Sequence, residues 1–210
     1  MNEKQKRILM ALIGVLVTGC SVGLFQMASL GTDPFTSFVT GICNLFNMKF
    51  GIFYTIICAC IFFIVFLLDK HYIGIATFFN LIGNGFAADA TTSILSRIIP
   101  NLTITHRIIL LILGIVVMCF AAALYFTADL GVSVYDAISI IMSDKKIASF
   151  RICRIGTDSI CAVIGLVLKA SIGVGTIVTA LFMGSLIQIF KTYCAEPLLY
   201  GSRTVKKLNM

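Results

Sequence analysis

The stretch LGTDPFTSF, residues 30–38, places an aspartate and a proline between two runs that are otherwise almost entirely apolar. One hundred positions later, residues 130–138 read LGVSVYDAI and repeat this polar break. Glycine favours the end of a helix, whereas Asp, Ser and an adjoining Pro favour the start of one. We therefore predict that each break ends one helix and begins a short second helix, with helix caps at Gly31, Pro34, Gly131 and Ser133.

The composition of the 210-residue chain is that of a membrane protein. Hydrophobic residues make up 59% of the chain and charged residues 12%, and the mean hydropathy is +1.04. Soluble domains contain about 25% charged residues. A helix of about 20 apolar residues crosses a bilayer, and apolar runs of that kind begin near residues 8, 50, 73 and 108. We predict an all-α transmembrane fold, a polytopic helical bundle.

An internal repeat organises the chain. Residues 7–31 match residues 107–131 without a gap, and IGIAT at 73–77 corresponds to IGVGT at 172–176. Such self-similarity indicates a duplication. We predict one integral membrane domain, residues 1–210, built from two tandem pseudo-symmetric repeats of about four segments each, with a short second helix in each repeat. The predicted parts are repeat 1 at 7–96, repeat 2 at 107–191 and a cytoplasmic tail at 192–210.

The short second helices either cross the bilayer, which makes the two halves parallel, or dip in and return, which makes them inverted. Lysine and arginine mark the cytoplasmic side. If the short helices cross, all 16 basic residues except Lys70 and Lys169 lie on the N-terminal side; if they return, all except Lys49, Arg97, Arg107 and Lys169 do. Both arrangements place the N- and C-termini in the cytoplasm, and the count modestly favours crossing and parallel halves.

The starts of the short helices admit a structural and a functional interpretation. Capping explains Asp33 without any use of its charge, because Ser133 takes the matching position in the second repeat. In the functional interpretation, the free amides and positive dipole of each helix start face a polar or anionic ligand near the outer face. Two such starts related by pseudo-symmetry then frame one shared site.

The stretches ASLGTDP at 28–34, DLG at 129–131 and IGVGT at 172–176 resemble the YczE/YyaS/YitT family of small bacterial membrane proteins. The resemblance covers nearly the whole chain. It implies a multi-pass protein of the bacterial cytoplasmic (inner) membrane, and it supplies no catalytic residues.

Charged side chains within spans are costly in hydrocarbon and usually face a cavity or a partner. Arg154 and Asp158 stand four residues apart, so we predict a structural ion pair along one helix face. Asp136 takes the position of Thr36 in the first repeat, which breaks the pseudo-symmetry in charge. For Asp89, a structural role, either snorkelling or a contact between helices, and a ligand role are both open.

The segment 73–96 also carries polar side chains at helical spacing, among them two asparagines one turn apart. Polar residues in a span join neighbouring helices in many membrane proteins and line a polar path in others. The candidate substrate-binding residues of the whole chain are Asp33, Thr36, Asn80, Asn84, Asp89, Tyr135 and Asp136.

Enzyme signatures do not fit this chain. The stretch GVGT at 173–176 lacks the third glycine of a dinucleotide-binding loop and the Gly-Lys-Ser/Thr of a phosphate loop. His71 and His106 are predicted on opposite sides of the bilayer, which excludes a shared metal site. We expect no enzymatic activity, no cofactor and no bound metal. The net charge of +7 is attributed to basic cytoplasmic segments that attract anionic lipid, without a pattern for nucleic acid.

Two classes of function fit this sequence. The first is a small permease or carrier for a small polar or cationic solute, with proton coupling through Asp136 or Asp89. The alternative is a non-transporting membrane scaffold, or a regulatory partner of other membrane or biosynthetic proteins. A single cavity that gathers Asp33, Asn84 and Asp136 favours the carrier, whereas separate helix contacts favour the scaffold. The lipid bilayer and a small polar solute are the expected partners.

Overall fold

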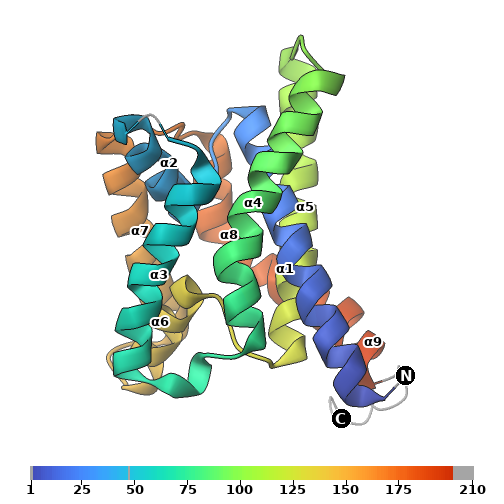
Figure 1. Ribbon diagram of the computed structural model, residues 1–210, viewed down its shortest axis with the longest axis vertical. Coiled ribbons are helices and arrows are strands. Elements are labelled where there is room, and N and C mark those ends of the chain that lie inside the picture. Colours follow the sequence, from blue (N-terminus) through green and yellow to red (C-terminus); the bar gives the residue numbers. More distant parts are fainter. Residues whose placement is uncertain (1, 47, 201–210) are drawn as a thin grey trace.

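The computed structural model describes residues 2–46 and 48–200, and their secondary structure is helical (Figure 1). Nearly every predicted segment corresponds to one helix, and the helices follow one another through short turns. Their bounds are α1 Glu3–Ala28, α2 Pro34–Phe46, α3 Phe50–Leu68, the short 3-10 helix η1 Lys70–Tyr72, α4 Ile75–Ile98, α5 Ile104–Ala128, α6 Val134–Asp144, α7 Phe150–Val167, α8 Val174–Phe190, the π-helical turn η2 Lys191–Ala195 and α9 Glu196–Tyr200.

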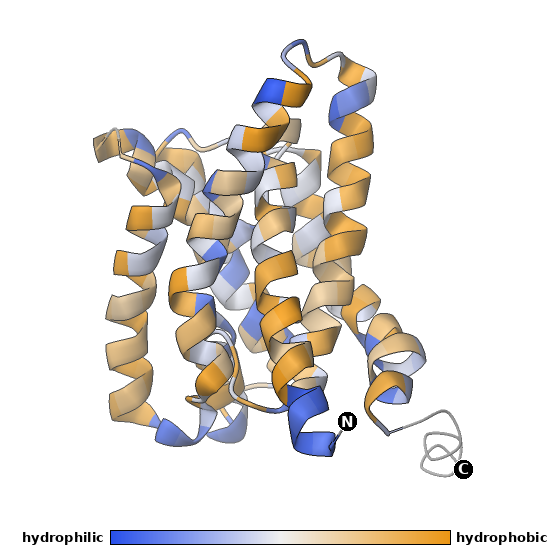
Figure 2. Ribbon diagram, turned by 45° about the vertical axis from the view of Figure 1, so that its right-hand side comes forward, coloured by the Kyte–Doolittle hydropathy of each residue, from blue (hydrophilic) through white to orange (hydrophobic). Residues whose placement is uncertain are grey.

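Four helices are long and apolar enough to cross a membrane: α1, α3, α5 and the continuous run Val174–Tyr200. Their outward faces carry large apolar side chains, among them Leu67 and Phe63 on α3. Figure 2 shows hydrophobic residues along most of the helix surface, with hydrophilic residues at helix ends and between the helices. Extensive exposed apolar surface marks contact with a membrane or a partner, and with these helix lengths it indicates a helical membrane protein.

Helices α1 and α5 pack closely and run antiparallel. The Arg7 side chain near the start of α1 donates to the carbonyl of Ala128 at the end of α5 (3.2 Å), and Arg107 near the start of α5 donates to Ala28 at the end of α1 (3.4 Å). A Cβ atom added at Gly14 of α1 would lie 2.8 Å from an α5 carbonyl oxygen. A small residue here is therefore what lets the two backbones approach.

The prediction of parallel halves is wrong. Helix α1 ends and α3 begins at the same end of the bundle, because α4 contacts both: Thr92 donates to Gln26 of α1 (2.9 Å) and Asp89 accepts from the amide of Gly51 on α3 (2.9 Å). Helix α2 therefore returns to the end that it left. The count of basic residues was a weak guide, since the two arrangements differ by only two residues.

Helix α6 returns in the same way at the opposite end of the bundle. It follows the end of α5, beside Arg7 near the N-terminus. Its last residue, Asp144, accepts a hydrogen bond from Tyr72, which lies in the turn between α3 and α4. Figure 1 shows the two short helices at opposite ends of the bundle, each entering it only partway.

The left-handed residues that end α1 and α5 are Ser29 and Asp129, with φ of 51° and 52°. The expectation that Gly31 and Gly131 cap these helices is therefore wrong by two positions. The two glycines do adopt positive φ, 104° and 101°, but they do so within the extended link that leads to the short helix. Asp is enriched in the left-handed region and other residues without β-branching enter it occasionally, so a glycine was not required at the cap itself.

Each extended link crosses the start of a helix from the other half of the chain. The carbonyl of Leu30 accepts from the amide of Gly175 at the start of α8, and the carbonyl of Leu130 accepts from Ala76 at the start of α4, both at 3.0 Å. A Cβ atom on Gly31 would lie 2.7 Å from the backbone nitrogen of Gly173, directly before α8. One on Gly131 would lie 2.5 Å from the backbone nitrogen of Gly74, directly before α4. Both glycines are thus required by close backbone approach as well as by φ.

The short helices begin with the residues that the sequence indicates. Pro34 is the first residue of α2, and an oxygen of Asp33 accepts from the amide of Thr36 at 3.0 Å. Ser133 caps α6, because its hydroxyl oxygen accepts from the amide of Asp136 at 3.4 Å. These caps satisfy amides that a helix start otherwise leaves unpaired.

Beyond α8 the chain remains helical as far as Tyr200, where a tail was expected from residue 192. Ala195 and Leu199 are buried in a cluster with residues of α1 and α5, and the Tyr200 hydroxyl accepts from Arg7 at 3.0 Å. The last part of the predicted tail, 201–210, lies outside the described residues.

Candidate functional site

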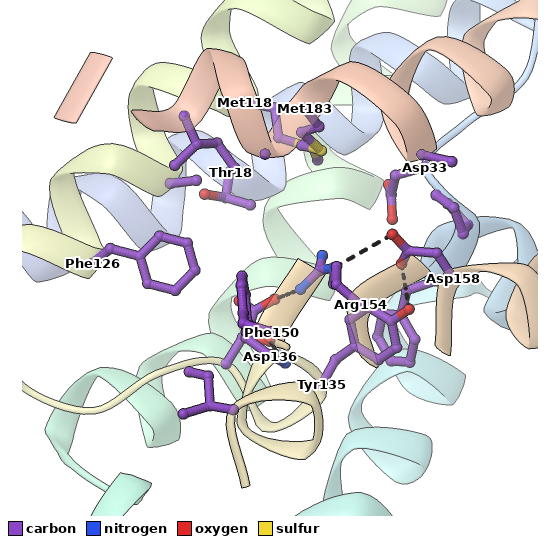
Figure 3. Close-up of a pocket in the computed structure, with 18 of the residues that line it drawn as sticks. Thr18, Asp33, Met118, Phe126, Tyr135, Asp136, Phe150, Arg154, Asp158 and Met183 are labelled. Carbon is purple, nitrogen blue, oxygen red and sulfur yellow. Dashed lines mark hydrogen bonds and ion pairs between the residues drawn. The ribbon is translucent and has the colours of Figure 1, made fainter. Parts of the chain in front are cut away.

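A cavity of about 910 Å³ lies between the helices and is lined by residues from α1 to α8, including both short helices. Its polar lining comes from both halves of the chain, and Figure 3 shows several of these side chains pointing toward one another. The charged and hydrogen-bonding residues that line its inner part are Thr18, Asp33, Thr36, Tyr54, Asn80, Asn84, Tyr125, Ser133, Tyr135, Asp136, Arg154 and Asp158.

Arg154 of α7 joins two buried aspartates. Its guanidinium binds Asp136, in the first turn of α6, and lies 3.4 Å from Asp158, one turn further along α7. Each aspartate also accepts a hydrogen bond from a tyrosine: Tyr125 donates to Asp136 and Tyr135 donates to Asp158. One cation thus holds two carboxylates whose remaining oxygens are occupied by phenols, as buried charges require.

Tyr135 stacks at 4.5 Å on Phe35, the second residue of α2, and its ring centroid lies 4.8 Å from the Arg154 guanidinium carbon. This contact joins the starts of the two short helices. They therefore meet inside the bundle, so their predicted place near the outer face is wrong, while a ligand at these helix starts stays a prediction. The links that precede them carry each helix start into the molecule.

Asp33 completes the acidic part of the cavity. One of its oxygens caps α2, while its Oδ1 is buried and has no hydrogen-bond partner among the described residues. Figure 3 shows its side chain pointing toward Asp158, and the charges of Asp158 and Arg154 both act on it. Three carboxylates therefore line this part of the cavity, and one guanidinium pairs with two of them.

A second, uncharged cluster lies where α3 and α4 face the cavity. The Tyr54 hydroxyl donates to Asn80 (3.0 Å) and accepts from the Asn84 side-chain amide (2.7 Å). The Oδ1 atom of Asn84 lies against α1, where a Cβ on Gly19 would approach it to 2.9 Å, and it has no hydrogen-bond partner among the described residues. The two asparagines of α4 are thus aligned by one phenol.

The cavity reaches the surface at one end. Its outer lining includes exposed Asp144 at the end of α6, exposed Arg151 at the start of α7 and exposed Gln188 near the end of α8. This is the end of the bundle that holds the N-terminus, because Arg7 of α1 contacts the ends of α5 and α9 there.

At the end of the bundle where α3 begins, α3 packs tightly on α4. A Cβ added at Gly85 would lie 2.9 Å from the Cα of Gly51, whereas one added at Gly184 of α8 would meet nothing within 4 Å. Asp89 belongs to this closed contact, where it accepts from the Gly51 amide, and it does not line the cavity. Of the two interpretations of Asp89, the structure shows the contact between helices.

The structure brings together the other six predicted binding residues, Asp33, Thr36, Asn80, Asn84, Tyr135 and Asp136. The sequence did not single out Tyr54 and Tyr125, because both stand in apolar runs. Their positions held a signal: Tyr54 stands 100 residues before Arg154, and Tyr125 stands 100 residues after Phe25. Comparing the two repeats position by position would have marked both as changes in polarity.

Comparison with known proteins identifies the family. Residues 5–192 match the family described as "Family of unknown function (DUF6198)". The chain belongs to the DUF6198 family. It is 27% identical over 195 residues to an uncharacterized protein of Haemophilus influenzae, covering 93% of this chain and 88% of the relative. It is also 21% identical over 181 residues to the uncharacterized protein YyaS of Bacillus subtilis, covering 85% of this chain and 89% of YyaS. The YyaS match confirms the family resemblance of the sequence. No solved structure matches the chain.

Proposed function

We propose that this DUF6198 protein is a carrier for a small cationic solute. The observation that carries the proposal is the shared cavity, in which Arg154 pairs with Asp136 and Asp158 and a third aspartate, Asp33, belongs to the same lining. If all four groups are ionised, two negative charges remain uncompensated in the inner cavity. Charged groups within a membrane protein usually mark a solute or ion pathway, and an excess of carboxylates selects for a cation.

The volume of the cavity supports a solute of low molecular weight. Ligand pockets are typically about 300–1,000 Å³, and this cavity measures about 910 Å³. It extends from the acidic centre to one surface of the molecule. A solute can therefore enter from that surface and reach Asp33 and Asp136 without crossing the apolar exterior.

We further propose that the two halves are inverted repeats. Arg7 in the first half bonds to the end of α5 in the second half, and Arg107 in the second half bonds to the end of α1 in the first. The carbonyls of Leu30 and Leu130 likewise each bond to a helix start in the other half. Repeats of inverted topology whose interrupted helices meet at a central site are typical of transporters. In this arrangement α1, α3, α4, α5, α7 and α8 cross the bilayer, and both termini lie in the cytoplasm.

This topology predicts that Lys49 and Lys70 lie on opposite sides of the membrane, with Lys49 outside. Alkaline phosphatase folds actively only outside the cytoplasm, so a phosphatase domain inserted after Lys49 should be at least about tenfold more active than one inserted after Lys70, as the positive-inside rule requires. Phosphatase activity per amount of inserted protein in intact cells measures this. A higher activity after Lys70 would overturn the arrangement, because either a crossing α2 with cytoplasmic termini or a reversed orientation places Lys70 outside. Equal activity would show that α3, the helix between the two insertion sites, does not cross.

The carrier proposal predicts that Asp136→Asn lowers cation transport by about tenfold or more, because the loss of one carboxylate leaves Arg154 less compensated and weakens cation binding by about 1.4 kcal/mol or more. Concentration jumps of methylammonium or guanidinium chloride on proteoliposomes adsorbed to a solid-supported membrane give the transport current. Gel filtration establishes that the variant is folded.

The matched control is Asp129→Asn, because Asp129 is exposed and outside the cavity and asparagine tolerates its left-handed conformation. This variant should carry the wild-type current. If neither cation produces a current with folded wild-type protein, the carrier is excluded for these solutes and the scaffold alternative replaces it. Equal currents from Asp136→Asn and wild type would remove the acidic centre from the mechanism.

A further inference from the structure

The hydrogen bonds of the acidic centre differ from one aspartate to the next. Asp136 and Asp158 each hold one tyrosine hydroxyl and one part of the Arg154 guanidinium. Asp33 accepts from the backbone amide of Thr36, and its buried Oδ1 has no hydrogen-bond partner among the residues that the structure describes. A buried carboxylate oxygen without a donor is unfavourable, so this oxygen is the one that a ligand can satisfy.

The requirement at Asp33 is specific about the ligand's chemistry. A carboxylate accepts hydrogen bonds, so the ligand must offer an N–H or O–H donor there. The nearby charge of Asp158 further favours a donor that carries positive charge, and hydrogen bonds between ionised partners are the strong ones. A protonated primary amine meets both conditions, whereas a quaternary ammonium ion has the charge but no N–H.

The opposite wall of the cavity is apolar. It is formed by α1, α5 and α8, and it includes two methionines that face the same space in Figure 3, Met118 of α5 and Met183 of α8. Methionine adapts its shape to different ligands and is common at surfaces that bind several related ones. The other apolar residues that these helices contribute to the lining are Val22, Ala122, Phe126, Ala180, Leu181, Ile187 and Ile189.

We propose that the cavity binds a primary ammonium ion with an apolar body, the ammonium group at Asp33 beside Asp158 and the body against the wall of Met118 and Met183. This proposal rests on the proposed carrier function and names its class of solute. Asp33 is then a residue that determines specificity, because it is the acidic residue of the centre with an oxygen left for the ligand.

The test is direct binding to the full chain in detergent, measured by isothermal titration calorimetry with 2-phenylethylammonium. Three ligands with a similar body separate the contributions: 2-phenylethanol lacks the charge, trimethyl(2-phenylethyl)ammonium lacks the N–H donors, and phenylacetate has the opposite charge. The primary amine should bind at least about tenfold more tightly than each of them, since one charge-assisted hydrogen bond accounts for a factor of that size or more. Ethylammonium, which lacks the ring, should bind at least about tenfold more weakly.

The decisive variant is Asp33→Asn, which removes the charge while asparagine still caps α2 as well as aspartate does. It should lower the affinity for 2-phenylethylammonium at least tenfold, and Asp33→Ser, which copies the cap at Ser133, should do the same. Asp129→Asn should leave the affinity unchanged. Equal affinity of the amine and the alcohol, or unchanged affinity of the folded Asp33 variants, would overturn the proposal.

The binding experiment tests the class of solute, and the transport experiment tests the carrier function, so the two proposals can be rejected independently. If 2-phenylethylammonium does not bind but methylammonium or guanidinium produces a current, the proposed class of solute is wrong and the carrier function stands. If the amine binds at Asp33 but no cation produces a current, the assigned ligand chemistry stands and the carrier function is wrong.

Discussion

Gly131→Ala is expected to lower the free energy of unfolding by about 3–5 kcal/mol, the sum of backbone strain and overpacking. Alanine is strained at the φ of 101° that this residue adopts. Its Cβ atom would also lie 2.5 Å from the backbone nitrogen of Gly74 and 2.7 Å from its Cα atom. Backbone atoms cannot rotate away as a side chain does, so the link between α5 and α6 must shift.

The measurement is the midpoint of thermal unfolding of the purified protein, together with the fraction that elutes as a single species. Gly31→Ala should behave alike, because the same contact recurs at the start of α8. Gly156→Ala is the matched control: an added Cβ there meets nothing within 4 Å, and alanine is the better helix former. A midpoint for Gly131→Ala within about 2 °C of wild type would show that the link is not held in this conformation.

Arg154→Met is the second change with a large expected effect, about 3–5 kcal/mol of unfolding free energy. It removes the partner of two carboxylates that are 4% and 6% exposed, Asp136 and Asp158. Methionine preserves much of the side-chain volume, so the loss reflects the unpaired charges more than a cavity. The thermal midpoint should fall by several degrees.

Restoring neutrality separates charge from packing. In the triple variant Arg154→Met, Asp136→Asn, Asp158→Asn, the charges of all three paired residues are gone and the tyrosine hydroxyls keep acceptors. It should therefore be more stable than Arg154→Met alone. Arg151→Met, one turn earlier on α7 and exposed, should be close to wild type. If the triple variant is no more stable than the single one, the destabilisation does not come from the stranded carboxylates.

Much of the local structure follows from the sequence, because its causes are local. The apolar runs became helices, and Asp33, Pro34 and Ser133 occupy helix starts through contacts within three residues. The Arg154–Asp158 contact is likewise a contact within one helix. Such features can be predicted from the spacing of residues along a helix and from the residue types that favour helix caps.

What the sequence could not supply depends on contacts between distant segments. The antiparallel order of α1 and α5 is fixed by packing at Gly14 and by the hydrogen bonds of Arg7 and Arg107. A count of basic residues considers each loop separately and contains no information on these contacts between helices. Asp89 sits among polar residues of α4 but is turned toward the amide of Gly51 on α3. That orientation depends on where α3 lies, which helical spacing within α4 does not reveal.

The unequal packing of the two helix pairs has a mechanical consequence. Position 184 corresponds to 85 in the proposed repeats, and Gln188 corresponds to Asp89; yet Gly184 is exposed where Gly85 is pressed against α3. If the halves exchange conformations, α8 should swing onto α7 and Gln188 should reach the Arg151 amide, while α4 parts from α3. In the proposed carrier, the opening of the cavity at the N-terminal end would then close and a matching opening would form at the other end, as in the alternating access of transporters built from inverted repeats.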